Sequence, residues 1–257
     1  MSEIAALGID VGSATAKVVA VDAAGELAWH LIEPTAPRIE EQARRLLEAA
    51  RQRAGRPALP AIATGYGRKL APDVDRALTE ITCHARGVHR RLGHTGTLID
   101  IGGQDSKVIA IGADGQVIHF AMNDKCAAGT GRFLEVSATR LEIPIDRLGR
   151  TALEATAEVR ISSTCTVFAE SEIVSLLARG QSVESIVRGL VRSLVLRVVA
   201  LAKSVRPKPP FMLSGGVARC EAVRAFLGEA LGEPVELPDE PQLMGAYGAA
   251  VMALAAD

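Results

Sequence analysis

The chain has 257 residues and a formal net charge of −1, and 48% of its residues are hydrophobic but only 3% aromatic. This length suits one large domain or two small ones, with a core of aliphatic side chains. The balanced charge gives no electrostatic reason to expect nucleic acid or an anionic membrane as a partner. No apolar run is long enough to cross a bilayer, and the first residues lack the basic start of a signal peptide. We therefore expect a cytoplasmic protein.

Hydrophobic patterning predicts strands that alternate with helices in the first third of the chain. Residues 4–22 are predicted to form a strand ending at Asp10, a tight turn, and a second strand that Lys17 opens. The other elements expected in this part are a strand at 27–31, a helix at 38–54, a short strand ending in a glycine turn at 61–67, and a helix at 77–92.

The strand-turn-strand pattern returns 90 residues later. Over positions 9–21, six of 13 residues are identical to those at 99–111, and the matches include Asp10 with Asp100 and Lys17 with Lys107. Polar and glycine positions match as well as apolar ones. We interpret this as an internal duplication of a β-hairpin that carries an Asp and a glycine turn.

After the second hairpin the same alternation continues. The expected elements are helices at 133–140, 170–179 and 183–205, a strand at 211–214, a helix at 222–231, a strand at 235–237 and a closing helix at 242–256. Strands alternating with helices predict an α/β fold with helices packed on the sheets. We expect two duplicated lobes, one formed by 1–94 with 242–257 returning to it, the other by 95–241.

Two duplicated Asp-x-Gly turns suggest a cleft with one glycine loop from each lobe, because glycine lets backbone N–H groups approach phosphate. Asp10 and Asp100 are candidates to hold Mg²⁺ through water. Lys17 could contact phosphate and Gln104 could position an attacking water. The remaining candidates for nucleotide contact are Gly12, Ser13, Ala14, Gly102, Gly103, Gly215, Gly216 and Val217.

Four ordered segments carry a resemblance to a known superfamily. Residues 8–13, 99–104, 213–217 and 243–250 resemble the phosphate-1, phosphate-2, adenosine and connecting motifs of the sugar kinase/Hsp70/actin superfamily. This resemblance implies two ribonuclease-H-like lobes, an actin-like ATPase fold, that close on Mg-ATP.

Two of the four cysteines stand in polar loops of small residues. Cys126 precedes the glycine-spaced turn Gly129-Thr130-Gly131 and a predicted helix, and Cys165 also lies beside a helix start. A helix N-terminus favours both phosphate and a thiolate, so we add Gly129 and Thr130 to the candidate nucleotide contacts. Cys83 and Cys220 have helical contexts and are interpreted as structural.

Without a Cys-x-x-Cys pair, a metal site must gather distant cysteines or cysteines from two chains. Two thiolates cannot complete a four-thiolate site, whereas a symmetric dimer supplies enough for a [4Fe–4S] cluster on its twofold axis. The residues alone do not decide between such a cluster and two thiols that bind no metal. Glu170 and Glu172 could orient water or magnesium, or form a solvated helix face.

The segments around both thiols resemble one family within this superfamily. Residues 123–135 and 163–172 are similar to the signature segments of the activator ATPases of (R)-2-hydroxyacyl-CoA dehydratases and the ATPase subunits of benzoyl-CoA reductase, with further matches at 63–68 and 80–85. The resemblance implies that Cys126 and Cys165 bind a [4Fe–4S] cluster shared by a homodimer or by paired similar subunits.

It also implies an ATP-driven one-electron transfer to a partner. The donor would be ferredoxin or flavodoxin, and the acceptor a 2-hydroxyacyl-CoA dehydratase or a benzoyl-CoA reductase core. Two other classes compete with this interpretation. A small-metabolite kinase of the same superfamily would need a general-base Asp in its substrate pocket, and none is evident. An assembly protein that uses ATP as a switch would bind no iron.

Overall fold

The computed structural model describes residues 3–162 and 165–255. The chain divides into two compact units. The first contains the chain up to Thr95, the segment Ile111–Ile118 and the chain from Pro238 on; the second contains Gly96–Ala110 and His119–Leu237. Each unit is built on a five-stranded sheet with helices against it, so the predicted α/β class is confirmed.

The sheet of the first unit has the strand order β3-β2-β1-β4-β5. Strand β1 pairs antiparallel with β2 and parallel with β4, which makes the sheet mixed. Because β1 is central, its residues are almost all buried, as its continuous apolar run predicts. The strands are β1 Ile4–Val11, β2 Thr15–Asp22, β3 Leu27–Pro34, β4 Ala61–Thr64 and β5 Arg76–Ala77.

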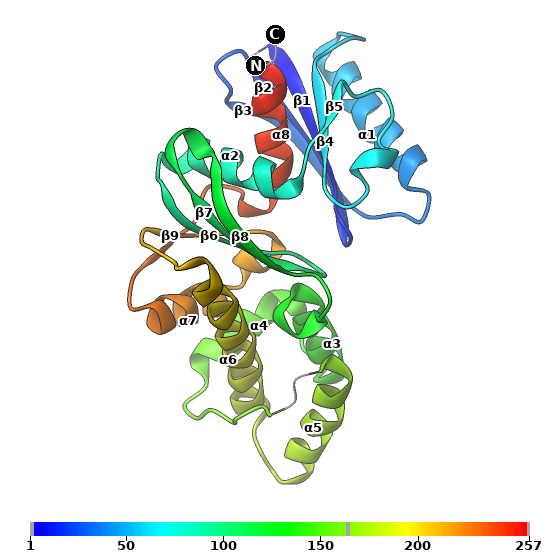
Figure 1. Ribbon diagram of the computed structural model, residues 1–257. Coiled ribbons are helices and arrows are strands. Elements are labelled where there is room, and N and C mark those ends of the chain that lie inside the picture. The colour runs from blue at the N-terminus through cyan, green and yellow to red at the C-terminus, as the bar shows by residue number, and fades with distance from the viewer. Residues whose placement is uncertain (1–2, 163–164, 256–257) are drawn as a thin grey trace. The chain divides into compact units, whose positions relative to one another are not determined.

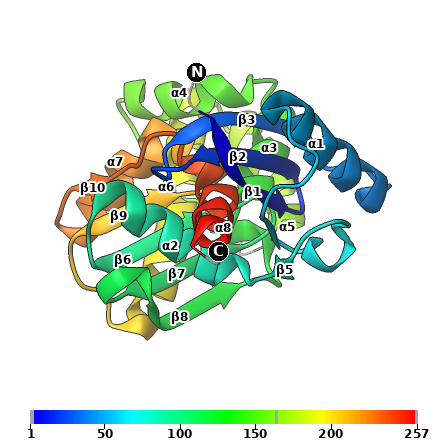
Figure 2. The same ribbon diagram turned by 90° about the horizontal axis from the view of Figure 1, so that it is seen from above.

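The helices of the first unit cover both faces of this sheet. Helix α1 (Ile39–Ala54) packs on β1, β2 and β3, whereas α8 (Met244–Leu254) packs on β1, β2 and β4 from the other face, with α2 (Glu80–Leu92) against α8 (Figures 1 and 2). Helix α2 begins where Thr79 accepts a hydrogen bond from the Thr82 N–H. The predicted helix at 77–92 thus starts three residues later than expected.

The sheet of the second unit has the order β10-β9-β6-β7-β8, and β9 pairs parallel with both β6 and β10. Aliphatic residues of β6, β7 and β9 form one core with the helices of this unit. The strands are β6 Gly96–Ile101, β7 Ser106–Ile111, β8 Val117–Asn123, β9 Phe211–Ser214 and β10 Val235–Glu236.

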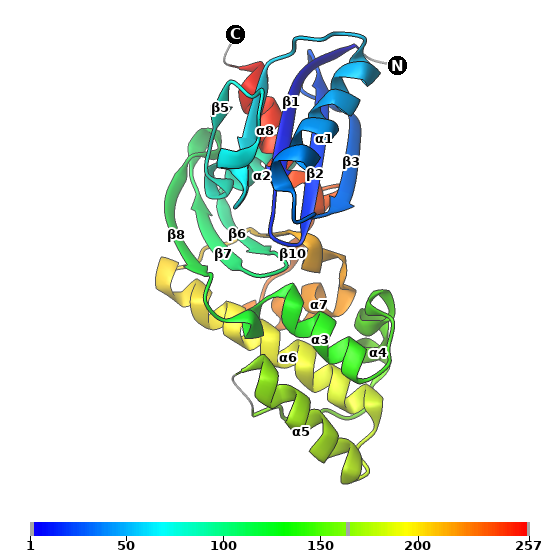
Figure 3. The same cartoon turned by 90° about the vertical axis from the view of Figure 1, so that its right-hand side faces the viewer.

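The helices of the second unit gather around the long helix α6, as Figure 3 shows. They are α3 Gly131–Arg140, α4 Leu148–Glu154, α5 Thr166–Ala178, α6 Val183–Ala202 and α7 Glu221–Leu231. Helix α4 is too short for its apolar spacing to stand out in the sequence. Helix α5 begins four residues earlier than predicted, directly after Cys165. The short 3-10 helices of the chain are η1 Arg68–Leu70, η2 Ala113–Gly115, η3 Ala127–Gly129, η4 Ile145–Arg147, η5 Lys203–Val205, η6 Gly216–Arg219 and η7 Pro241–Leu243.

The duplicated hairpin is confirmed by hydrogen bonds that recur at the same offset of 90. The Gly12 N–H donates to the Thr15 carbonyl at 3.1 Å, and the Gly102 N–H donates to the Asp105 carbonyl at 2.9 Å. The next turns also match, because the Gly25 and Gly115 N–H groups donate to the carbonyls of residues 22 and 112.

Among the described residues, no helix is long and apolar enough to cross a membrane.

Candidate functional site

The first acidic turn, which we define as Asp10, Gly12 and Lys17, lies at the end of β1. Asp10 and Lys17 face each other across the β1–β2 register, and the Lys17 Nζ donates to Asp10 Oδ2 at 2.9 Å. Both residues are buried. A buried charge needs a partner, and each member of this pair provides one for the other.

Two glycines distant in the sequence, one in the loop after β4 and one in the first turn of α8, lie against the Asp10 carboxylate. A Cβ on Gly65 would overlap Asp10 Oδ1, and Gly65 has a φ of +88°, which favours glycine. A Cβ on Gly245, at the start of α8, would lie 2.6 Å from His84 Nε2 and 3.3 Å from Asp10 Oδ2. The buried imidazole of His84 therefore lies beside the first acidic turn, which the sequence did not reveal.

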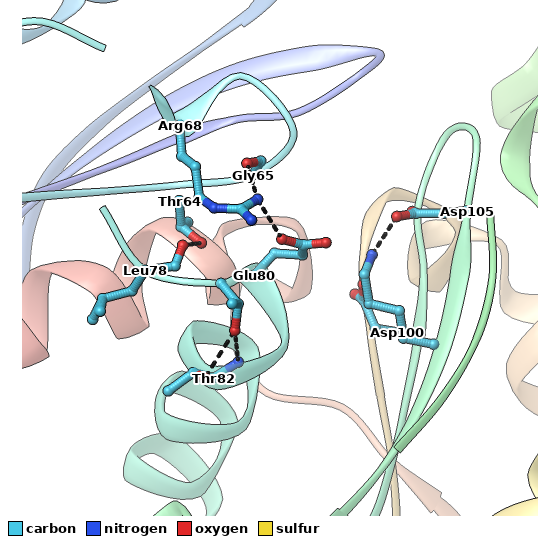
Figure 4. A network of polar contacts seen from close by, with 10 residues as sticks. Thr64, Gly65, Arg68, Leu78, Glu80, Thr82, Asp100 and Asp105 are labelled. Atoms are coloured by element: carbon cyan, nitrogen blue, oxygen red, sulfur yellow. Dashed lines mark hydrogen bonds and ion pairs between the residues drawn. The ribbon is translucent and has the colours of Figure 1, made fainter. Parts of the chain in front are cut away.

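A polar network fastens the loop after β4 to the start of α2 (Figure 4). Arg68 donates to the Gly65 carbonyl at 2.9 Å and pairs with Glu80 at 3.2 Å. Both residues fall in segments that carry the family resemblance, yet neither had an assigned role. The network sets the position of Gly65 and so supports the wall around Asp10.

The second acidic turn, which we define as Asp100, Gly102, Asp105 and Lys107, is richer in carboxylates. The Lys107 Nζ lies 2.5 Å from Asp105 Oδ2 and 3.7 Å from Asp100 Oδ2, and all three side chains are buried. Figure 4 shows Asp100 and Asp105 at this turn. Ser214 donates its hydroxyl to Asp100 Oδ1 at 2.8 Å. Asp105 is a site residue that the sequence analysis missed. Asp105 aligns with Thr15 in the duplicated hairpin, and this change from a hydroxyl to a carboxylate could have drawn attention to it.

The duplication extends beyond the hairpin to a third strand in each unit. In the parallel pair β1–β4, Asp10 lies opposite Thr64, and in the pair β6–β9, Asp100 lies opposite Ser214. The residue that follows each hydroxyl is a glycine with positive φ, Gly65 at +88° and Gly215 at +89°. A hydroxyl followed by a left-handed glycine thus stands beside the aspartate in both units.

Helix α3 is attached to the second acidic turn by its own N-terminus. The Gly131 N–H donates to the Gly102 carbonyl and the Arg132 N–H donates to the Gly103 carbonyl, both at 2.8 Å. These N–H groups are ones that a helix leaves without an intrahelical partner. They bind the turn, so the glycine spacing at 129–131 serves close backbone packing. Contact between nucleotide and Gly129 or Thr130 stays a prediction.

The four cysteines fall into two classes. Cys126 and Cys165 are exposed, and each directly precedes a helix, η3 and α5 respectively. Cys83 is buried, and burial raises the pKa of its thiol to about 12. Burial also raises the pKa of Cys220. Only the first two are therefore placed to act as ligands from the surface.

The chemistry of each donor set decides what it could hold. Carboxylates suit Mg²⁺, and the backbone N–H groups of glycine turns suit phosphate; both acidic turns supply a carboxylate and a glycine turn. Exposed thiols suit a soft metal centre, and Cys126 and Cys165 are the right donors. Within residues 3–162 and 165–255, no three His, Cys, Asp or Glu side chains converge as a metal site, so two thiols would be half of a four-thiolate set.

Comparison with known proteins agrees with these features. The chain is 40% identical over 251 residues to the (R)-2-hydroxyglutaryl-CoA dehydratase activating ATPase of Acidaminococcus fermentans, covering 96% of each. It is 32% identical over 195 residues to a subunit of the benzoyl-CoA reductase of Thauera aromatica, covering 73% of this chain and 68% of that one. The structure of the 2-hydroxyisocaproyl-CoA dehydratase activator from Clostridium difficile with bound ADPNP superposes with a TM-score of 0.90 at 38% identity, covering 98% of this chain and 94% of that one.

The two duplicated units and their acidic turns define an ATPase with the actin-like fold. A family model, that of the BadF/BadG/BcrA/BcrD ATPase family, matches residues 7–253. The chain belongs to this family, and the resemblance seen in the sequence is confirmed.

Proposed function

We propose that this chain is a reductive activator, which couples ATP hydrolysis to the transfer of one electron to a partner enzyme. One observation carries the proposal: the backbone bonds from Gly131 and Arg132 to Gly102 and Gly103. They join the turn that would sense phosphate to the helix that follows Cys126. A shift of the second acidic turn during the ATPase cycle would therefore move the start of α3 and the Cys126 loop.

On the ATP side, the two acidic turns have distinct tasks in this proposal. Asp10 and Asp100 hold Mg²⁺ through water, and the glycine turns that follow them bind phosphate. Gln104 is exposed at the second turn, as a residue that orients an attacking water must be. Lys17 is bound to Asp10, so its contact with phosphate would be shared with that carboxylate. Gly215, Gly216 and Val217 contact the nucleoside.

On the electron side, Cys126 and Cys165 bind a [4Fe–4S] cluster together with the same two thiols of a second copy, or of a similar subunit. Such a cluster supplies a single low-potential electron when it is bound. The two cysteines hold it at the protein surface, where a redox partner can approach. Both thiols are exposed in the single chain, which is what a site shared between two chains requires.

The electron acceptor is proposed to be an acyl-CoA dehydratase or a benzoyl-CoA reductase core. The dehydratase activators and the benzoyl-CoA reductase subunit among its relatives support this class of partner. Ferredoxin or flavodoxin would be the electron donor. The acyl-CoA chemistry is proposed to belong to the partner.

The deciding experiment is anaerobic purification followed by iron and sulfide analysis and EPR of the dithionite-reduced protein. About four irons per dimer are expected for a single shared cluster. Cys126→Ser and Cys165→Ser should each lose the iron and the EPR signal. An iron-free protein that still activates its partner would refute the proposal.

The other two cysteines provide matched controls. Cys83→Ser and Cys220→Ser should keep the iron, because neither thiol is exposed. In the iron-free protein at neutral pH, a maleimide should label Cys126 and Cys165 and leave Cys83 unmodified. A pKa of about 12 leaves Cys83 with very little thiolate, and burial blocks access to it.

A further inference from the structure

Asn123, the last residue of β8, binds the backbone of Cys126 from both sides. Its Nδ2 donates to the Cys126 carbonyl at 2.7 Å, and its Oδ1 accepts from the Cys126 N–H at 3.1 Å. In this contact the donor and the acceptor are two separate atoms at the end of one short side chain, an arrangement that the amide of asparagine provides. Asn123 is the single asparagine in the sequence, although aspartate, serine and threonine are frequent.

The turn that follows Cys126 is also held by contacts of Gly129 and Thr130. A Cβ on Gly129 would lie 3.2 Å from Asn123 Nδ2, so the amide lies against the glycine of η3. Thr130 donates both its N–H and its hydroxyl to the Ala127 carbonyl, at 3.0 and 2.8 Å. The chain from β8 to α3 is thus fixed at both ends of the Cys126 loop, although Cys126 itself is exposed.

Near Cys165, the carboxylate of Glu172 makes a comparable contact with the backbone. Glu172, in the second turn of α5, accepts from the Ser162 N–H at 2.8 Å and from the Ser162 hydroxyl at 2.7 Å. Ser162 lies three residues before Cys165, and the Cys165 carbonyl accepts the first helical bond of α5, from the Ala169 N–H at 2.9 Å. Ser162, three residues before Cys165, is therefore held onto the helix that Cys165 opens.

We propose that Asn123 and Glu172 are positioning residues, which set the backbone at the two exposed thiols before any metal binds. This inference rests on the proposed function for the identity of the ligand, but the contacts belong to the chain alone. Because outer residues that orient metal ligands change affinity about 10- to 100-fold, the effect should be measurable without any assay of the partner enzyme.

The first test uses the metal-free protein. In Asn123→Ala, the Cys126 amide should exchange its hydrogen about fivefold faster, which is the loss expected for one hydrogen bond. Asn123→Asp should be intermediate, because it keeps an acceptor for the N–H but places an oxygen against the Cys126 carbonyl. Exchange in β6 and α6 should not change. Unchanged exchange at Cys126 would overturn the role of Asn123.

The second test uses the anaerobically reconstituted protein. Asn123→Ala and Glu172→Ala, which removes the acceptor for both Ser162 bonds, should each release iron to a chelator about tenfold faster than the wild type, with an unchanged midpoint of urea unfolding. Glu170→Ala is the matched control, since Glu170 lies on the same helix and lines the groove between α3 and α5, while Glu172 is the residue that holds Ser162. It should release iron at the wild-type rate. Equal rates in all variants would overturn the proposal.

The two tests separate this inference from the proposed function. If the wild type binds no iron, the proposed function fails, and the amide exchange alone decides whether Asn123 positions Cys126. If the wild type binds iron and Cys126→Ser loses it, while Asn123→Ala behaves as the wild type in both tests, the proposed function stands and this inference fails. A lowered unfolding midpoint with faster exchange throughout the chain would show a structural role and also overturn it.

Discussion

The two acidic turns come from one duplicated hairpin, yet they carry different charge. In the first, one carboxylate and one ammonium group form a closed pair, Asp10 with Lys17. In the second, Lys107 is shared between Asp105 and Asp100, so the turn carries one more carboxylate than ammonium group. The change from Thr15 to Asp105 at the matching position makes this difference.

The hydroxyls beside the two aspartates also differ in what they bind. Thr64 donates to the Leu78 carbonyl at 3.1 Å, whereas Ser214 donates to Asp100 at 2.8 Å. Excess negative charge that is hydrogen-bonded in place suits a cation. The comparison indicates that the second turn is the better suited of the two to hold Mg²⁺, whereas the first turn is more neutral and is lined by glycines.

The largest expected effect comes from removing the shared lysine. Lys107→Met takes away the ammonium group that two buried carboxylates share, and breaking a buried pair costs about 3–5 kcal/mol of unfolding free energy. Lys17→Met affects one carboxylate and should cost less. Urea unfolding of both variants without nucleotide provides the measurement. Equal losses would mean that the two turns do not differ in charge as described.

A smaller effect is expected from crowding the junction between α3 and the second acidic turn. In Gly131→Ala the new Cβ would lie 3.1 Å from the Gly102 carbonyl oxygen and 3.1 Å from Val217 Cγ2. Overpacking of this kind costs about 1–3 kcal/mol. The proposed coupling should weaken as well, seen as fewer electrons delivered per ATP hydrolysed.

The first turn offers the control for that variant. There the Gly12 carbonyl accepts from the Thr35 hydroxyl at 2.7 Å rather than from a helix. Thr35→Val should cost about 1 kcal/mol for the lost hydrogen bond and leave the electron count per ATP unchanged. If both variants uncouple equally, the link through α3 is not the route.

Asp105→Asn tests the charge difference itself, because it makes the second turn resemble the first. Lys107 would then pair with the Asp100 carboxylate. The Mg²⁺ concentration for half-maximal ATP hydrolysis should rise about tenfold, as for loss of an outer-shell group. A titration of activity against Mg²⁺ checks this. An unchanged Mg²⁺ requirement would assign no role to the extra carboxylate.

The smallest effect is expected at an exposed pair, which serves as a reference for the buried ones. Arg45 donates to Glu33 at 2.9 and 2.5 Å and lowers the pKa of that carboxyl from 4.5 to about 2. Because the native pKa is depressed, the stabilisation is present above pH 4.5 and is lost as the pH falls towards 2.

Both side chains of this pair reach solvent, so its contribution is below about 1 kcal/mol. Glu33→Gln should therefore lower the unfolding free energy slightly at neutral pH. The difference from the wild type should shrink as the pH falls below 4.5. A difference that grows towards acid would contradict the assignment.

Local patterns were enough to predict much of this molecule. The hairpin at 9–21 and its copy at 99–111 could be predicted because a strand and its turn are determined by residues that are consecutive in the sequence. Most helices were placed correctly by their apolar spacing, and α4 was missed because it is too short to show one. The exposed thiols stood out because their neighbours are small and polar.

Other site residues depend on pairing between distant strands. Ser214 meets Asp100 from 114 residues away, through the parallel pair β6–β9. His84 lies beside Asp10 only because α8, from the far end of the chain, packs against both α2 and β1. No local sequence pattern predicts contacts between residues so far apart in the chain.

By itself, therefore, the sequence determined the family, the duplicated acidic turns and the two candidate thiols, since each is carried by a short run of residues. The tertiary structure decided how these parts act on one another. It showed that Lys107 is shared, that α3 is bound to the second acidic turn, that Asn123 binds the backbone of Cys126, and that Glu172 binds Ser162. Each of these depends on hydrogen bonds and charges whose partners become neighbours only when the chain is folded.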